Sequence, residues 1–97
     1  MDLEERSKGK RDRLRVIYDI LNVIRNHGNS IKPTPLLRYS NLSSQNFSKY
    51  LDELLEKGFV EEGTDKRKRR VYVLTEKGYK YIEKYKSIVS FVEEFNL

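Results

Sequence analysis

The chain has 97 residues, with no cysteine and no tryptophan, a charged fraction of 36% and a formal net charge of +5. This length fits one domain with a single modest core, and the lack of cysteine excludes disulfides and thiolate metal sites. No apolar run approaches the roughly 18–20 residues that cross a bilayer, and the charged N-terminus has no signal-peptide core. We therefore expect a cytoplasmic protein without membrane contact. Its positive net charge favours a polyanionic partner.

Residues 1–10 are polar, and we expect them to form a flexible basic lead-in. A helical pattern follows over residues 11–27. Its apolar residues recur at three- and four-residue steps and share one face, namely Leu14, Ile17, Leu21 and Ile24. Gly28 is expected as the left-handed residue just past this helix. The cations around its start form either a phosphate-binding patch or a surface that aids solubility; they are Lys8, Lys10, Arg11, Arg13 and Arg15.

Two helices joined by a tight turn are predicted next. Pro35 fits the first turn of a short helix over residues 35–39, with Thr34 as its N-cap. Asn41 is the residue of the turn best able to adopt a left-handed backbone. Ser43 is expected to cap a second helix that runs to about Lys57.

The first two turns of that second helix carry short or amide side chains and one cation. These residues are Ser44, Gln45, Asn46, Ser48 and Lys49. Such side chains can enter a major groove and bond to base edges and phosphates, and the N-terminal end of a helix also favours anions. The bland alternative is an ordinary amphipathic helix with a polar outer face. We expect this helix to read DNA.

A basic hairpin is predicted after it. Two strands, over residues 59–62 and 71–74, are separated by turn residues at 63–65. A run of five cations follows that turn: Lys66, Arg67, Lys68, Arg69 and Arg70. Holding five like charges together is unfavourable unless a polyanion neutralises them. Although a charge run is often a solvated loop, we expect the first three, at the tip, to contact phosphates or the minor groove.

The full set of predicted DNA-contacting residues combines three segments. It comprises Lys32, Thr34 and Arg38 from the short helix, Ser43, Ser44, Gln45, Asn46, Ser48 and Lys49 from the second helix, and Lys66, Arg67, Lys68, Arg69 and Arg70 from the hairpin.

The last helix is predicted to start after Thr75, its N-cap, and to run nearly to residue 97. Apolar residues spaced four, three, four and three apart form a heptad seam of Tyr81, Tyr85, Ile88, Val92 and Phe95. Other apolar residues lie off this seam, so the helix needs two partners. One is its own domain, and we expect the other to be a second copy, packed antiparallel. The alternative is a seam that packs only on its own domain.

Catalysis is not expected. The single histidine, His27, is explained by its place at a helix C-terminus. Metal-ligand clusters, phosphate-binding loops and nucleophile motifs are not visible in the sequence. We therefore predict neither an enzyme, nor a metal, nor a cofactor, nor a small-molecule ligand.

The stretch LLRYSNLSSQNFSKYLDELLEKGFV, from Leu36 to Val60, resembles the winged helix-turn-helix of MarR-type regulators. VYVLTEKGYKYI resembles that family's second wing strand and the start of the following helix. Over residues 11–97 the chain looks most like small archaeal dimeric winged-helix proteins, of which some are chromatin-associated and others are encoded by archaeal viruses. The resemblance implies DNA binding as a dimer, through the wing and Ser44, Gln45, Ser48 and Lys49. Asn41 replaces the common turn glycine. We do not expect the extra N-terminal helix with which full MarR-type proteins build their dimer and ligand pocket, and therefore we expect no effector-binding site.

The expected fold is α+β, mainly α: a winged helix-turn-helix with a two-stranded β-hairpin wing and a long C-terminal dimerisation helix. Residues 1–10 are the flexible basic N-terminus, 11–75 the winged domain and 76–97 the C-terminal helix. The expected function is that of a homodimeric, sequence-specific transcriptional regulator on double-stranded DNA, located in the cytoplasm with the nucleoid. Two alternatives stay open: a low-specificity chromatin protein, and a winged-helix module for protein–protein interaction.

Overall fold

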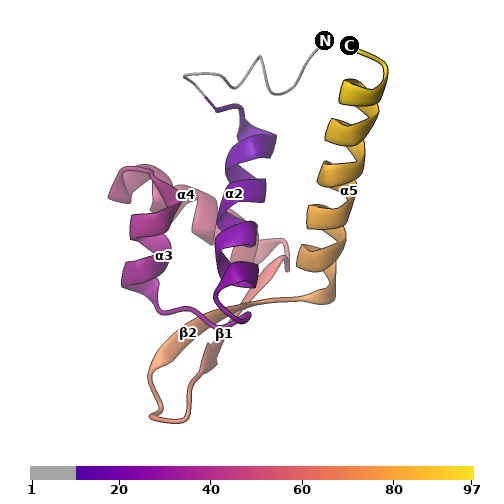
Figure 1. The fold of residues 1–97 in the computed structure, drawn as a ribbon. Helices are drawn as coiled ribbons and strands as arrows, with labels where there is room; N and C mark the ends of the chain where they lie inside the picture. Colours follow the sequence, from indigo (N-terminus) through magenta and orange to yellow (C-terminus); the bar gives the residue numbers. More distant parts are fainter. Residues whose placement is uncertain (1–10) are drawn as a thin grey trace.

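The computed structural model describes residues 11–97 (Figure 1). In chain order, the elements are α2 (Arg13–Asn26), α3 (Pro33–Ser40), α4 (Ser44–Glu56), β1 (Val60–Thr64), β2 (Arg70–Leu74) and α5 (Glu76–Glu94). This order confirms the mainly α fold with a two-stranded hairpin and a long last helix. The predictions for residues 1–10, including those for Lys8 and Lys10, lie outside the described residues.

The first described helix, α2, is slightly shorter than predicted at both ends. Asp12 is its N-cap, and its side chain accepts a hydrogen bond from the Arg15 backbone N–H. His27 is the C-cap, and Gly28 follows with φ +71°, as predicted. The left-handed glycine redirects the chain toward α3.

The helix α3 begins two residues before the predicted start. Lys32 is its N-cap, so the prediction of Thr34 in that role was wrong. Both Pro33 and Pro35 lie in the first turn, where backbone N–H groups have no intrahelical partner and a missing N–H costs nothing. At the other end Ser40 belongs to the helix, and Asn41 ends it with φ +54°, as predicted.

The cap of α4 was predicted correctly. The Ser43 side chain accepts a hydrogen bond from the Asn46 N–H, and Gly58, with φ +76°, lies just past the other end of the helix. The apolar side of α4 is buried through Phe47, Leu51 and Leu54.

The hairpin is longer than predicted. Val60 pairs with Leu74 and Thr64 with Arg70, so Gly63 and Thr64, predicted as turn residues, belong to β1. The turn occupies residues 65–69 instead, because the Asp65 N–H donates to the Arg69 carbonyl and closes the loop there.

A third segment joins the sheet without forming a strand of its own. Ile31 and Tyr72 form an isolated antiparallel bridge, each donating its N–H to the other's carbonyl. The bridge ties the α2–α3 connection to the wing.

The core is centred on α2. Its Ile20, Leu21 and Ile24 are fully buried, as are Leu36 of α3, Leu54 of α4 and Ile82 of α5. Leu14 was predicted on the same inward face, yet it is 48% exposed. It lies on the first turn of α2 next to the buried Val16 and Ile17. Its backbone carbonyl accepts a hydrogen bond from Tyr81 of α5, but its side chain stays about half exposed.

Candidate nucleic-acid interface

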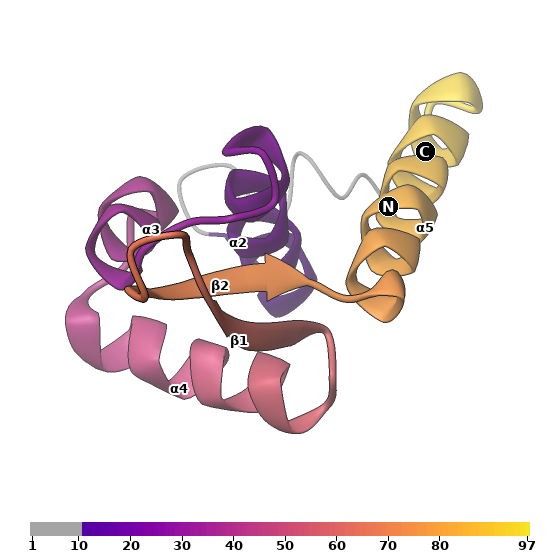
Figure 2. The same cartoon turned by 90° about the horizontal axis from the view of Figure 1, so that it is seen from below.

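The N-terminal half of α4 presents a polar surface to solvent. All five side chains predicted to enter a groove are exposed: Ser44, Gln45, Asn46, Ser48 and Lys49. Figure 2, which looks at the molecule from below, shows α4 lying alongside the hairpin. The helix and the wing therefore sit side by side on one domain.

The positive end of the α4 helix dipole, at its N-terminus, is not neutralised by an acidic side chain in the first turn. The Ser43 hydroxyl satisfies one backbone N–H, that of Asn46, and the earlier N–H groups of the turn have no intrahelical acceptor. Such an end attracts an anion such as a phosphate oxygen.

One acidic residue organises the tip of the wing. The Oδ1 atom of Asp65 accepts hydrogen bonds from the backbone N–H groups of Arg67 (2.8 Å) and Arg69 (2.9 Å). Its Oδ2 accepts from Nε of Arg69 (2.8 Å). These bonds, led by the one from the Arg69 backbone, lower the pKa of Asp65. Lys68 has φ +62°, so the loop is tightly turned.

The five wing cations divide into two groups. Arg69 pairs with Asp65, and Arg70 lies 3.7 Å from Glu62. Lys66, Arg67 and Lys68 are exposed at the tip, and their side chains have no ion pair among residues 11–97. The three cations predicted at the tip are thus the three available to an external anion.

The α3 candidates are spread along the helix. Lys32 and Thr34 lie at its N-terminal end and are exposed, whereas Arg38 lies near its C-terminal end. The Arg38 guanidinium stands 5.3 Å from the centre of the Tyr39 ring, and that ring packs 5.1 Å from His27. No local pattern predicts the contact with His27, because His27 caps the end of α2 whereas Tyr39 lies in α3.

The arginines at the start of α2 are engaged inside the domain. Arg11 contacts Asp19 and the carbonyls of Ser40 and Asn41. Arg15 donates to Asp19 (3.1 Å). Neither contact was predicted, because these cations were expected only as phosphate ligands or as solubilising charges.

Arg13 ties α2 to the candidate reading helix. It forms an ion pair with Glu53 of α4, and Glu53 also accepts from the Lys57 ammonium (2.7 Å). The hydrogen bonds from Arg13 and then Lys57 lower the pKa of Glu53 to about 2.

The helix α5 is anchored to the domain through its first half. The Tyr85 ring, 5% exposed, stacks on Tyr18 at 4.6 Å. Tyr81 packs edge-on against Phe59, and its hydroxyl donates to the Leu14 carbonyl (2.7 Å). Burial raises the pKa of Tyr81 to about 12, so this donor keeps its proton.

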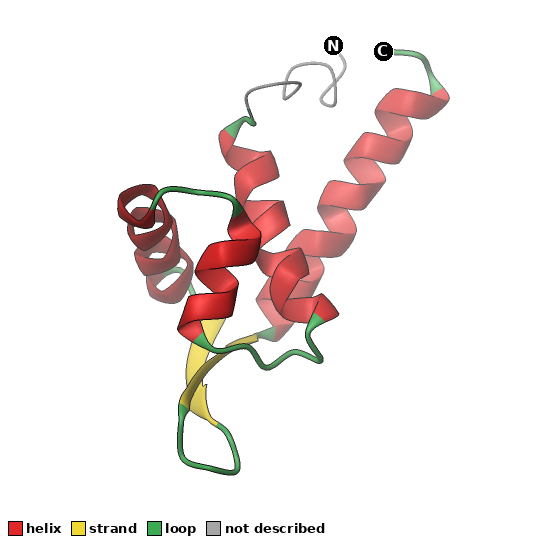
Figure 3. Cartoon of the chain, turned by 60° about the vertical axis from the view of Figure 1, so that its left-hand side comes forward, coloured by secondary structure: helices red, strands yellow, loops and turns green. Residues whose placement is uncertain are grey.

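The predicted heptad seam is therefore divided. Tyr81 and Tyr85 pack within the protomer. Ile88 and Phe95 are about half exposed, and Val92 is half-buried. Figure 3 shows the second half of α5 continuing away from α3, α4 and the hairpin. Of the five seam residues, those with exposed apolar surface therefore lie in this second half.

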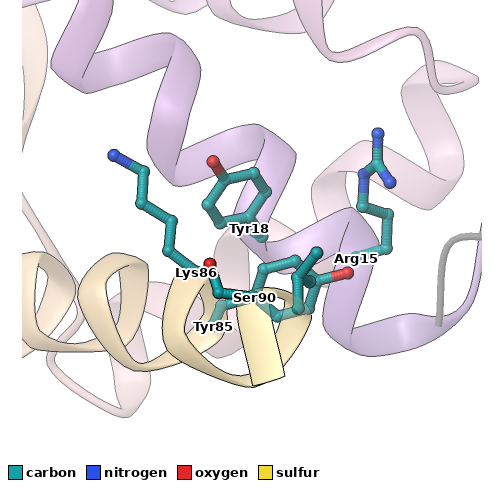
Figure 4. Close-up of a pocket in the computed structure, with 6 residues that line it drawn as sticks. Arg15, Tyr18, Tyr85, Lys86 and Ser90 are labelled. Atoms are coloured by element: carbon teal, nitrogen blue, oxygen red, sulfur yellow. The ribbon is translucent and has the colours of Figure 1, made fainter. Parts of the chain in front are cut away.

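A cleft of about 330 Å³ opens between α2 and α5 beside the stacked tyrosines. In Figure 4, Arg15 and Tyr18 project from α2, and Tyr85, Lys86 and Ser90 project from α5. The cleft lies at the point where α5 leaves α2.

Residues 11–97 contain no group of three or more histidine, cysteine or carboxylate side chains that could hold a metal ion. In the same range, no helix combines the length and apolar character that crossing a membrane requires.

A three-helix domain with a helix-turn-helix, a β-hairpin and an exposed polar helix start defines a winged helix-turn-helix protein. A family model described as winged helix-turn-helix matches residues 10–93, and the chain belongs to this family. An uncharacterized protein of the archaeon Methanocaldococcus jannaschii is 37% identical over 87 residues, which cover 90% of this chain and 79% of that protein.

Two solved structures share the fold. Sso10a-2, a DNA-binding protein from Sulfolobus solfataricus, matches with a TM-score of 0.70 at 24% identity, over 89% of this chain and 86% of its own. MepR, a transcription regulator of the Staphylococcus aureus multidrug efflux pump MepA, matches with a TM-score of 0.72 at 20% identity, over 82% of this chain and 60% of its own.

Proposed function

We propose that this protein binds duplex DNA as a homodimer and regulates transcription. The N-terminal half of α4 enters the major groove, and the wing tip contacts phosphates or the minor groove. The observation that carries the proposal is the pairing, on one domain, of a groove-compatible exposed helix start with three wing cations that form no ion pair with the described residues.

The chemistry of α4 suits direct reading of bases. The major groove is about 12 Å wide and admits an α-helix. One amide side chain can form two hydrogen bonds with the edge of an adenine. Gln45 and Asn46 supply such amides, while Ser44 and Ser48 supply short hydroxyls that donate or accept. Lys49 lies one position beyond Ser48 and is exposed. Its ammonium group can donate to a guanine edge or to a phosphate.

The wing adds affinity of another kind. Lys66, Arg67 and Lys68 would displace counterions from phosphates, which strengthens binding without selecting a sequence. Sso10a-2 is named as a DNA-binding protein and MepR as a transcription regulator, and both support the same role here.

The homodimer would form through the second half of α5. Ile88, Phe91 and Phe95 are each about half exposed, which is unusual for large apolar side chains grouped on one helix segment. Because Tyr81 and Tyr85 are already packed inside the protomer, the proposed interface centres on Ile88, Val92 and Phe95, with Phe91 beside them. Two α4 helices would then approach successive major grooves, about 34 Å apart.

The test is duplex affinity across a salt series, measured side by side on random DNA and on sequences enriched from a random pool. A steep salt dependence with a strong preference for one sequence supports a regulator. The same salt dependence without preference indicates low-specificity packaging with the nucleoid. Absence of binding even at low salt contradicts the proposal and favours a protein-interaction module.

A further inference from the structure

We propose that Arg11 is a positioning residue that sets the direction of α4 by holding the helix-turn-helix turn against α2. The functional half of this inference rests on the proposed reading of DNA by α4. Its structural half concerns the turn alone and can be tested without DNA.

The Arg11 guanidinium joins two parts of the domain. Its Nη2 donates to the carbonyl oxygens of Ser40 (3.0 Å) and Asn41 (2.9 Å), and its Nη1 donates to Oδ2 of Asp19 (2.9 Å). Its side chain is 25% exposed and that of Asp19 24% exposed. Arg11 thus connects α2 to the end of α3, because Ser40 and Asn41 lie 29 and 30 positions after Arg11 in the chain.

The turn requires such a donor. The last carbonyls of a helix have no intrahelical partner, and those of Ser40 and Asn41 point to the same side as the chain reverses. Asn41 is left-handed, with φ +54°, a conformation that side-chain-bearing residues enter at a cost. The planar guanidinium, with five donors in a fixed fork, can satisfy both carbonyls and a carboxylate together.

The rest of the turn transmits this constraint to α4. Ser40 is fully buried, and its hydroxyl donates to the Leu36 carbonyl (2.7 Å), which fixes the end of α3. Only Leu42 separates Asn41 from Ser43, the N-cap of α4. With so short a connection, a shift of the Asn41 carbonyl changes the entry angle of α4 and the aim of its first two turns.

A competing role for Arg11 is direct contact with a DNA phosphate. The two roles differ in what a lysine can replace. Lysine keeps the positive charge and can serve a phosphate, but its single ammonium cannot reproduce the three directed bonds of the guanidinium.

The experiment compares Arg11→Lys and Arg11→Gln with the parent protein. Affinity is measured for the enriched sequence and for random duplex over a salt series. Positioning predicts that both variants lower the ratio of the two affinities by about tenfold and leave the salt slope on random duplex unchanged. It also predicts faster amide hydrogen exchange at residues 41–44 in both variants.

A phosphate contact predicts the opposite pattern. Arg11→Gln would reduce the salt slope by about 0.9, Arg11→Lys would restore it, and hydrogen exchange at the turn would stay as in the parent. That result overturns the proposal, as does an unchanged affinity ratio in both variants. Arg25→Gln is the matched control, because it removes one charge from α2 at a side chain that faces Glu83 of α5.

Asp19→Asn covers the case in which the Arg11 variants do not fold. It keeps Arg11 but weakens its anchor on α2, and it makes the protein more positive by one charge. General attraction to DNA would then rise, whereas positioning predicts a lower affinity ratio and faster exchange at the turn. If the parent protein itself binds no DNA, the proposed function fails. Hydrogen exchange at residues 41–44 in Arg11→Lys then tests by itself whether Arg11 holds the turn.

Discussion

At the scale of single residues, the wing tip shows how one acid arranges several cations. Asp65 directly precedes the five positive residues, and its negative charge lowers the net charge that a polyanion would meet. Its carboxylate nevertheless accepts three hydrogen bonds that close the loop. Because Arg69 is held by this carboxylate, Lys66, Arg67 and Lys68 are left to project from a loop of fixed shape.

The wing prediction follows from this division of the cations. Replacing Lys66, Arg67 and Lys68 together by serine should lower affinity for any duplex and reduce the salt slope by about 0.9 for each lost phosphate contact. The preference among sequences should change little, because bases are read by α4. Binding isotherms over a salt series measure both effects.

The matched control replaces three exposed lysines of α5, Lys80, Lys84 and Lys86, by serine. It removes the same charge far from the wing. Equal loss of affinity in the control would show that net charge, and not the wing, accounts for binding.

A second residue-scale prediction concerns Glu53. Its pKa falls from 4.5 to about 2 in the folded protein because Arg13 and Lys57 bond to its carboxylate. A group whose pKa is depressed by folding stabilises the protein above its unfolded pKa and loses that contribution as the pH falls through the folded value. Glu53→Gln should therefore lower Tm above about pH 5, with the difference from the parent shrinking toward pH 2.

Thermal unfolding followed by circular dichroism from pH 7 to pH 2 measures this difference. Glu56→Gln, an exposed change on the same helix, is the control. A Glu53→Gln deficit that is the same at pH 7 and pH 2 would mean that the ion pair with Arg13 does not contribute to stability.

At the scale of elements, the junction between the wing and α5 explains the glycine in the LTEKG segment. Thr75 caps α5 through the Gly78 N–H, and its hydroxyl also donates to the carbonyls of Gly58 and Phe59. A Cβ on Gly78 would collide with the Phe59 carbonyl oxygen and press on Leu74. The first turn of α5 therefore lies directly on the backbone that leads into β1.

Gly78→Ala should destabilise the fold by about 1–3 kcal/mol, since backbone must move to admit the methyl group. Urea unfolding of the purified protein measures the loss. Gly63→Ala is the control, because its nearest neighbour is the Val71 methyl at 3.8 Å, an ordinary contact. Equal stability of the two variants would contradict the tight junction.

At the scale of the whole molecule, the wing and the proposed dimer surface on α5 lie far apart. The wing projects from one end of the domain, and the second half of α5 reaches toward the other (Figure 1). A second copy can therefore pack on α5 without covering α4 or the wing. This separation makes dimer formation and DNA contact independently testable.

Ile88→Glu combined with Phe95→Glu should convert a dimer into a monomer, because it places two charges in the proposed apolar contact. The monomer should fold, since both side chains are about half exposed in the protomer, and its affinity for a two-half-site duplex should fall. Analytical ultracentrifugation gives the mass. Lys86→Glu is the control on the same helix, and a parent protein that sediments as a monomer would contradict the dimer.

Local signals in the sequence were enough to predict the elements and the position of the wing cations. Ser43 and Thr75 cap the helices that they precede, Gly28 and Asn41 take left-handed backbones, and the first four cations of the run lie in the hairpin turn. The choice of partners required the tertiary structure. The contacts of Arg11 with the turn, of Tyr81 with Leu14 and of Ile31 with Tyr72 join residues 29 to 67 positions apart. Periodicity places a residue on a face of its helix, but only the packing of the elements decides what that face meets.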